Sequence, residues 1–109
     1  MERQRLTDLE QLLLLAVLQA GDDAHAGAVQ TVLDERGERK ASLGSLYVTL
    51  TRLEERGLVR SIKGEPTAER GGKAKRLYEV TREGLVALHH SRRVLDRMWE
   101  GVADATAEA

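Results

Sequence analysis

The side chains best suited to binding a polyanion gather in the middle of the chain. Residues 39–76 hold ten Lys or Arg and four Asp or Glu, a local charge of +6. The rest of the sequence carries −7, so the net charge of −1 hides a basic centre between acidic flanks. Such a layout favours contact between one face and a nucleic acid, although charges can also serve only to solvate a surface.

The segment SLGSLYVTLTRLEERG, residues 42–57, repeats leucines at helical spacing and therefore predicts an amphipathic helix. Ser and Thr can bond to base edges, and Arg can hold a guanine or a phosphate. Gly44 and the helix N-terminus would let backbone amides approach a phosphate. The alternative for Arg52 is a surface ion pair with Glu55. The residues expected to face outward are Ser45, Val48, Thr49 and Arg52.

A glycine-rich segment, GEPTAERGGKAK at residues 64–75, follows this helix and contains the only proline. Basic side chains on such a loop can lie along a phosphate backbone or enter a minor groove. A basic loop alone could merely favour solubility, but a polar helix face beside it points to duplex DNA. The basic residues here are Arg70, Lys73, Lys75 and Arg76.

Other chemistries find little support in the sequence. There is no cysteine, and no nucleophile is placed beside a base or within a phosphate-binding loop. His89 and His90 would diverge by about 100° on a helix, so surface or interface histidines are favoured over a metal site. We therefore expect no catalytic residue, no metal, no cofactor and no enzymatic activity.

The elements that would position the basic segment are three helices, a hairpin and a last helix. Thr7 and Glu10 form a capping box before an apolar run, and a second helix is expected over residues 24–36, capped from Gly21-Asp22-Asp23. Ser42 caps the third helix and Gly57 ends it. Strands are expected at 58–63 and 77–80, and Thr81 caps a helix running to about residue 103.

This order predicts a mainly α fold with a small β-hairpin: a winged helix-turn-helix plus a C-terminal dimerisation helix. Residues 1–80 would form the DNA-binding domain, in which the second helix of the pair enters the major groove. Residues 81–109 would form the dimerisation helix. The longest apolar run, residues 12–18, is too short to span a bilayer and no leader precedes it, so a cytoplasmic protein is expected.

The last helix carries one apolar side about 33 Å long, more than a winged-helix domain of this size can cover. A second copy of the chain is the simplest partner, and it would suit a palindromic operator. The apolar first helix should pack against the partner's last helix, and Arg92 interrupts any continuous coiled coil. The predicted dimerisation residues are Leu85, Leu88, Leu95, Met98, Trp99 and Val102.

The segments LGSLYVTLTRLEERGLV, GEPTAERGGKAKRLYEVTREG and RVLDRMWEGV resemble the PadR-like transcriptional regulators over nearly the whole chain. The resemblance implies a homodimeric winged-helix repressor of a nearby operon, in some cases released by a small ligand. Where the family often opens its second helix with Tyr-Gly, this chain has Ala24-His25-Ala26-Gly27. The resemblance places at or near DNA Ser42, Gly44, Ser45, Tyr47, Thr49 and Arg52, and in the wing Gly71, Gly72, Lys73 and Lys75.

Two further alternatives concern partners. Some members of this family bind planar compounds between subunits, so Trp99 could line a pocket for a small aromatic effector; packing within the dimer is the favoured role. A winged helix can also serve as a protein-interaction module without binding DNA. Retention on heparin or random duplex DNA at low salt distinguishes that function from DNA binding.

Overall fold

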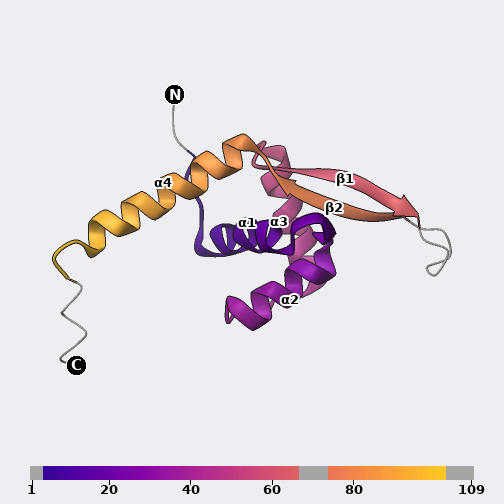
Figure 1. Ribbon diagram of the computed structural model, residues 1–109, viewed down its shortest axis with the longest axis horizontal. Helices are drawn as coiled ribbons and strands as arrows, with labels where there is room; N and C mark the ends of the chain where they lie inside the picture. The colour runs from indigo at the N-terminus through magenta and orange to yellow at the C-terminus, as the bar shows by residue number, and fades with distance from the viewer. Residues whose placement is uncertain (1–3, 67–73, 103–109) are drawn as a thin grey trace.

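The computed structural model describes residues 4–66 and 74–102. As predicted, it is mainly helical with one antiparallel hairpin, and the hairpin and the last helix leave the helical core in opposite directions (Figure 1). The elements of the described residues are α1 (Asp8–Ala20), the 3₁₀ turn η1 (Gly21–Asp23), α2 (Ala26–Arg36), α3 (Leu43–Glu55), β1 (Val59–Pro66), β2 (Ala74–Val80) and α4 (Arg82–Trp99).

Three of the predicted helix caps are confirmed. At the start of α1, the Glu10 amide donates to the Thr7 hydroxyl oxygen at 3.1 Å, and the Thr7 amide donates to the Glu10 carboxylate at 2.8 Å. Ser42 caps α3 and Thr81 caps α4, each accepting from the amide three residues later at 3.1 Å. Each cap satisfies amides that a helix leaves without a partner in its first turn.

The start of α2 differs from the prediction. The cap is His25, whose Nδ1 accepts from the Ala28 amide at 3.3 Å, and not an aspartate of the preceding turn. Ala24 is buried, and its carbonyl accepts from the Tyr78 amide of β2 at 2.9 Å. That contact holds Ala24 outside the helix, so α2 begins two residues later than expected.

The hairpin is longer than the apolar pattern predicted. Val59 pairs with Val80 and Ile62 with Leu77, and pairing continues past an irregularity to Pro66 and Ala74. Backbone bonds extend the ladder into polar sequence, which side-chain alternation cannot show.

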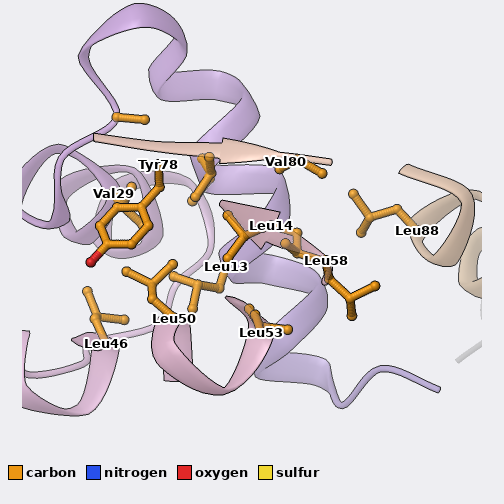
Figure 2. Packing of buried hydrophobic residues seen from close by; sticks show 14 of the residues in the cluster. Leu13, Leu14, Val29, Leu46, Leu50, Leu53, Leu58, Tyr78, Val80 and Leu88 are labelled. Carbon is orange, nitrogen blue, oxygen red and sulfur yellow. The ribbon is translucent and has the colours of Figure 1, made fainter. Parts of the chain in front are cut away.

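The core lies where α1, α2, α3 and the base of the hairpin meet (Figure 2). Leu13 and Leu14 of α1 are fully buried against the leucines of α3, and Tyr78 of β2 closes one side. The buried leucines of α3 are Leu46, Leu50 and Leu53.

Helix α4 joins this core only through its first two turns. Thr81 donates its hydroxyl to the Gly57 carbonyl at 2.6 Å and its amide to the Leu58 carbonyl at 3.1 Å. Gly84 is buried so closely that an added Cβ would overlap the Leu58 carbonyl oxygen. From residue 92 to residue 102 every residue is exposed, so the rest of α4 stands away from its own chain (Figure 1).

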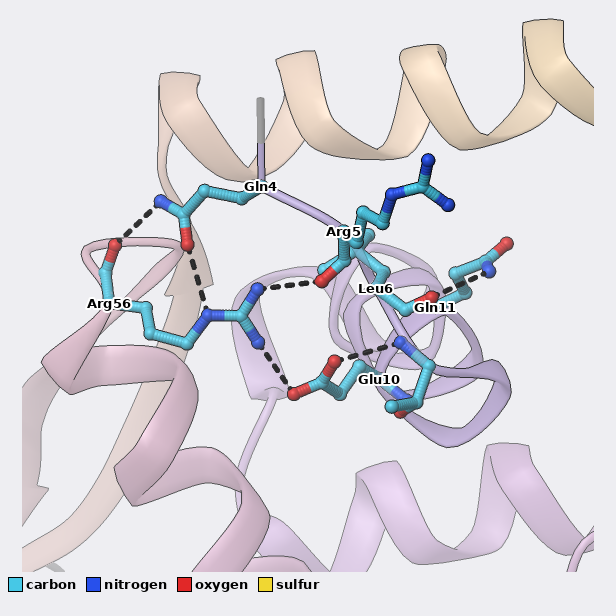
Figure 3. Close-up of polar contacts among 7 residues, drawn as sticks. Gln4, Arg5, Leu6, Glu10, Gln11 and Arg56 are labelled. Carbon is cyan, nitrogen blue, oxygen red and sulfur yellow. Dashed lines mark hydrogen bonds and ion pairs between the residues drawn. The ribbon is translucent and has the colours of Figure 1, made fainter. Parts of the chain in front are cut away.

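Arg56, directly after α3, fastens the chain start to the end of that helix (Figure 3). Its guanidinium donates to the Glu10 carboxylate at 2.7 Å, to the Gln4 side chain at 3.0 Å and to the Arg5 carbonyl at 2.8 Å. Gln4 returns a bond to the Arg56 carbonyl at 3.0 Å. We call this group the Arg56 clamp; it holds α1 and α3 in one relative position.

Because the Arg56 clamp includes the charged Glu10 carboxylate, we expect the stability of the fold to decrease in acid. Burial alone would raise the pKa of Glu10, but hydrogen bonds from Thr7 and Arg56 outweigh burial and hold it below its ordinary value of 4.5. A carboxylate with a lowered pKa contributes stability above that ordinary value, and the contribution is lost as pH falls through the folded-state pKa. We expect Glu10→Gln to lower the urea midpoint near neutral pH, and the difference from wild type to shrink in acid.

The control is Glu35→Gln, which alters an exposed carboxylate of α2. It should change the urea midpoint little at any pH. A Glu10→Gln deficit of the same size at pH 3 and pH 7 would contradict the role given to the Glu10 charge.

Candidate nucleic-acid interface

Helix α3 is divided lengthwise into a buried and an exposed face. Its three core leucines are completely buried, whereas Ser45, Val48 and Arg52 lie on the opposite side and are exposed. Helix α2 supports the start of α3, because Gln30 donates its side-chain amide to the Ala41 carbonyl at 2.8 Å. The pair therefore presents the second helix outward on a rigid base, as a helix-turn-helix does.

The hydroxyl groups of α3 are partly used within the helix. Ser42 Oγ accepts from the Ser45 amide, and Thr49 Oγ1 donates to the Ser45 carbonyl at 3.0 Å. Thr49 is half-buried as well. The predicted site residues with freely exposed surface on α3 are Gly44, Ser45, Tyr47 and Arg52.

Arg52 makes no ion pair with any residue in the described part of the chain, so the proposed pairing with Glu55 is not formed there. The neighbouring Glu54 instead accepts from the amide and hydroxyl of Ser61, at 3.0 and 2.7 Å. This contact fastens β1 to the last turn of α3. The hairpin is thus fixed to the end of α3, and Arg52 takes no part in this contact.

The tip of the hairpin falls outside the described residues, and with it the predicted site residues Arg70, Gly71, Gly72 and Lys73. Lys75 lies on β2 and is half-buried, and Arg76 pairs in register with Lys63 of β1. Arg60, nearer the core, is paired with Glu79 at 3.0 Å. The unneutralised positive charge of the described hairpin is therefore at its outer half.

A second surface runs between α1 and α4. Gln11, Leu15 and Leu18 of α1 face α4 across a groove of about 510 Å³, whose α4 side includes Leu95 and Trp99. Leu95 is 52% exposed and Trp99 56%, and Met98 and Val102 are exposed too. We call this surface the α1–α4 groove.

The predicted dimerisation residues do not all have the same surroundings. Leu88 is only 9% exposed and belongs largely to the core of its own chain, whereas Leu85 is exposed at the groove edge. His89 and Arg92 line the groove with them. Sequence reasoning missed the Arg56 clamp and the cap by His25.

Two findings concern other classes of site. Within residues 4–66 and 74–102, no three His, Asp or Glu side chains come together as a metal site would need. Among the helices described, none has the length and apolar character that crossing a bilayer requires.

Two packed helices with an exposed second helix, followed by a hairpin fastened to that helix, define the winged helix-turn-helix class. Solved structures share this fold. A PadR-like transcription factor from Bacteroides fragilis matches with a TM-score of 0.66 and 24% identity, over 84% of each chain. A PadR family regulator from Eggerthella lenta matches with a TM-score of 0.59 and 26% identity, over 90% of this chain and 80% of that one.

A third, a PadR family transcription regulator from Clostridium difficile, has a TM-score of 0.61 and 20% identity over 90% and 94% of the two chains. Among curated protein sequences, none matches this chain significantly. The sequence model of the transcriptional regulator PadR-like family matches residues 14–90. The chain belongs to the PadR-like family: it is a DNA-binding winged-helix regulator of transcription and not an enzyme.

Proposed function

We propose that this regulator is a homodimeric repressor that binds a palindromic operator beside the genes it controls. Residues 1–80 bind DNA, with α3 in the major groove and the hairpin along the backbone or in the minor groove. Residues 81–109 join two copies. The observation that supports this most directly is the exposed face of α3, which lies opposite three fully buried leucines. The same chain carries a hairpin that is fastened to the end of α3 and is basic in its outer half.

The roles proposed for single residues follow from their surroundings. Arg52, exposed and unpaired within the described chain, reads a base or holds a phosphate. Gly44 and Ser45 lie at the helix start, where amides can meet a phosphate. Ser42, Tyr47 and Thr49 border this contact, and Lys75 joins Arg70, Gly71, Gly72 and Lys73 along the backbone.

The test is a gel-shift assay with duplex DNA from the promoter of the protein's own gene. Lys75→Ala should weaken binding to all duplexes and flatten the salt dependence by about one unit per lost phosphate contact. Arg52→Ala should change sequence preference and cost about 1–3 kcal/mol if Arg52 reads a base.

The matched control is Arg93→Ala, which removes one exposed positive charge from α4. It should leave the shift unchanged. If the wild-type chain is not retained by heparin or duplex DNA at low salt, the protein-interaction function replaces this one. If neither Arg52→Ala nor Lys75→Ala alters binding, the assignment of α3 and hairpin to DNA is wrong.

A further inference from the structure

The outermost side chain of the proposed recognition helix is apolar. At 100° per residue, Val48 lies about 170° around α3 from the mean direction of its three buried leucines. It is 52% exposed, with Thr51 and Arg52 on either side. Valine has no hydrogen-bond donor or acceptor and is not a favoured residue on a solvated helix face. Its position at the centre of this face therefore calls for an apolar contact from outside the chain.

Gly44 lies one turn before Val48, within about 40° of it around the helix. Its backbone does not have a positive φ, and an added Cβ would meet nothing within 4 Å. Glycine inside a helix is less stable than alanine, so neither conformation nor internal packing explains it. The remaining physical use of a glycine is to let a ligand come close to the backbone.

Two hydroxyl groups of α3 are already engaged within the helix. The hydroxyl proton of Thr49 is donated to the Ser45 carbonyl, and the Ser42 hydroxyl accepts from the Ser45 amide. Between Thr51 and Arg52, the centre of the exposed face presents the methyl groups of Val48 and the bare backbone of Gly44. In the major groove the apolar group on a base edge is the C5-methyl of thymine.

We propose that Val48 recognises a thymine, with its γ-methyl groups against the C5-methyl and Gly44 allowing α3 to reach that depth. The inference rests on the proposed function, because it requires α3 in the major groove. It assigns to each half-site of the operator a thymine that is read without any hydrogen bond.

The experiment begins with the full chain selecting duplexes from a random pool. The preferred duplex is then resynthesised with deoxyuridine at each thymidine in turn, which deletes only the methyl group. One position per half-site should weaken binding about fourfold, the value of one buried methyl group. Val48→Ala should weaken binding to the thymine duplex and abolish the difference between thymine and uracil at that position.

Two further variants complete the test. Val86→Ala truncates a valine of α4 that is 55% exposed and should retain the full thymine–uracil difference. Gly44→Ala should raise the melting temperature, yet weaken binding on the order of tenfold, as one lost base contact does.

The possible outcomes separate the two hypotheses. If duplexes are selected but no uracil substitution weakens binding, or the loss persists in Val48→Ala, the thymine contact is wrong and the proposed function stands. If Gly44→Ala binds as wild type does, close approach at Gly44 is wrong. If no duplex is selected at all, the proposed function fails and this inference fails with it.

Discussion

Replacing Leu95 and Trp99 together with aspartate is expected to convert the proposed dimer into a folded monomer that no longer shifts its operator. Both side chains are more than half exposed in the single chain and line the α1–α4 groove. If a second copy covers that groove, each aspartate buries an unpaired charge, which interfaces do not tolerate. Residues 92–102 make no contribution to the core, so the chain itself should stay folded.

The measurement is sedimentation equilibrium of wild type and variant at micromolar concentration, beside a gel shift. Val86→Asp is the matched control, because Val86 is exposed on the opposite side of α4 from Leu95. It should remain dimeric and bind DNA. The proposed interface is wrong if the wild-type chain sediments as a monomer or if the double variant stays dimeric.

Trp99→Ala alone then distinguishes packing from effector binding. If Trp99 packs in the dimer, its loss should loosen the dimer and lower the melting temperature, consistent with about 3–5 kcal/mol for a buried tryptophan. If it lines a pocket for a planar aromatic effector, the dimer should persist while fluorescence quenching by such compounds disappears. Blue-shifted wild-type emission that no aromatic compound quenches would rule out the pocket.

Gly84→Ala is expected to destabilise the fold, although it adds only one methyl group. The added methyl would overlap the Leu58 carbonyl oxygen and crowd Val80 Cγ1. This backbone oxygen also accepts a hydrogen bond from the Thr81 amide. It therefore cannot move without breaking a contact that attaches α4 to the core. Overpacking of this kind costs about 1–3 kcal/mol and at times more.

The natural comparison is Gly44→Ala, the same change in another helix where a Cβ has open space. That variant should gain up to about 1 kcal/mol, because alanine is the better helix residue. Urea unfolding with an unchanged m-value measures both effects. Equal urea midpoints for Gly84→Ala and wild type would show that the backbone at Leu58 can move aside for the added methyl group.

The parts of the fold that local physics determines were predictable. Thr7, Ser42 and Thr81 are followed by apolar residues at helical spacing, so each cap and the buried face behind it could be read directly. The family was likewise predictable, from motifs spanning most of the chain. The exposed face of α3 followed from the positions of its leucines.

Features set by distant contacts were not predictable. His25 caps α2 because β2 holds Ala24 in place, whereas local preference favoured the aspartates just before it. Arg56 binds Gln4 and Glu10 across 46 or more residues, and nothing in its neighbourhood distinguishes it from a surface arginine. Which hydroxyls of α3 turn back on their own helix depends on rotamers, which sequence does not show.

The contacts of Thr81 and Gly84 with residues 57 and 58 have a consequence for the spacing of the operator half-sites. They fix α4 to the backbone beside α3 through two hydrogen bonds and a contact too close for a side chain. In a dimer held together by α4, the distance between the two α3 helices would then be fixed. A fixed distance of this kind would suit an operator whose two half-sites lie one helical turn apart, about 34–36 Å. Five inserted base pairs would turn one half-site to the far side of the duplex, beyond the reach of its α3.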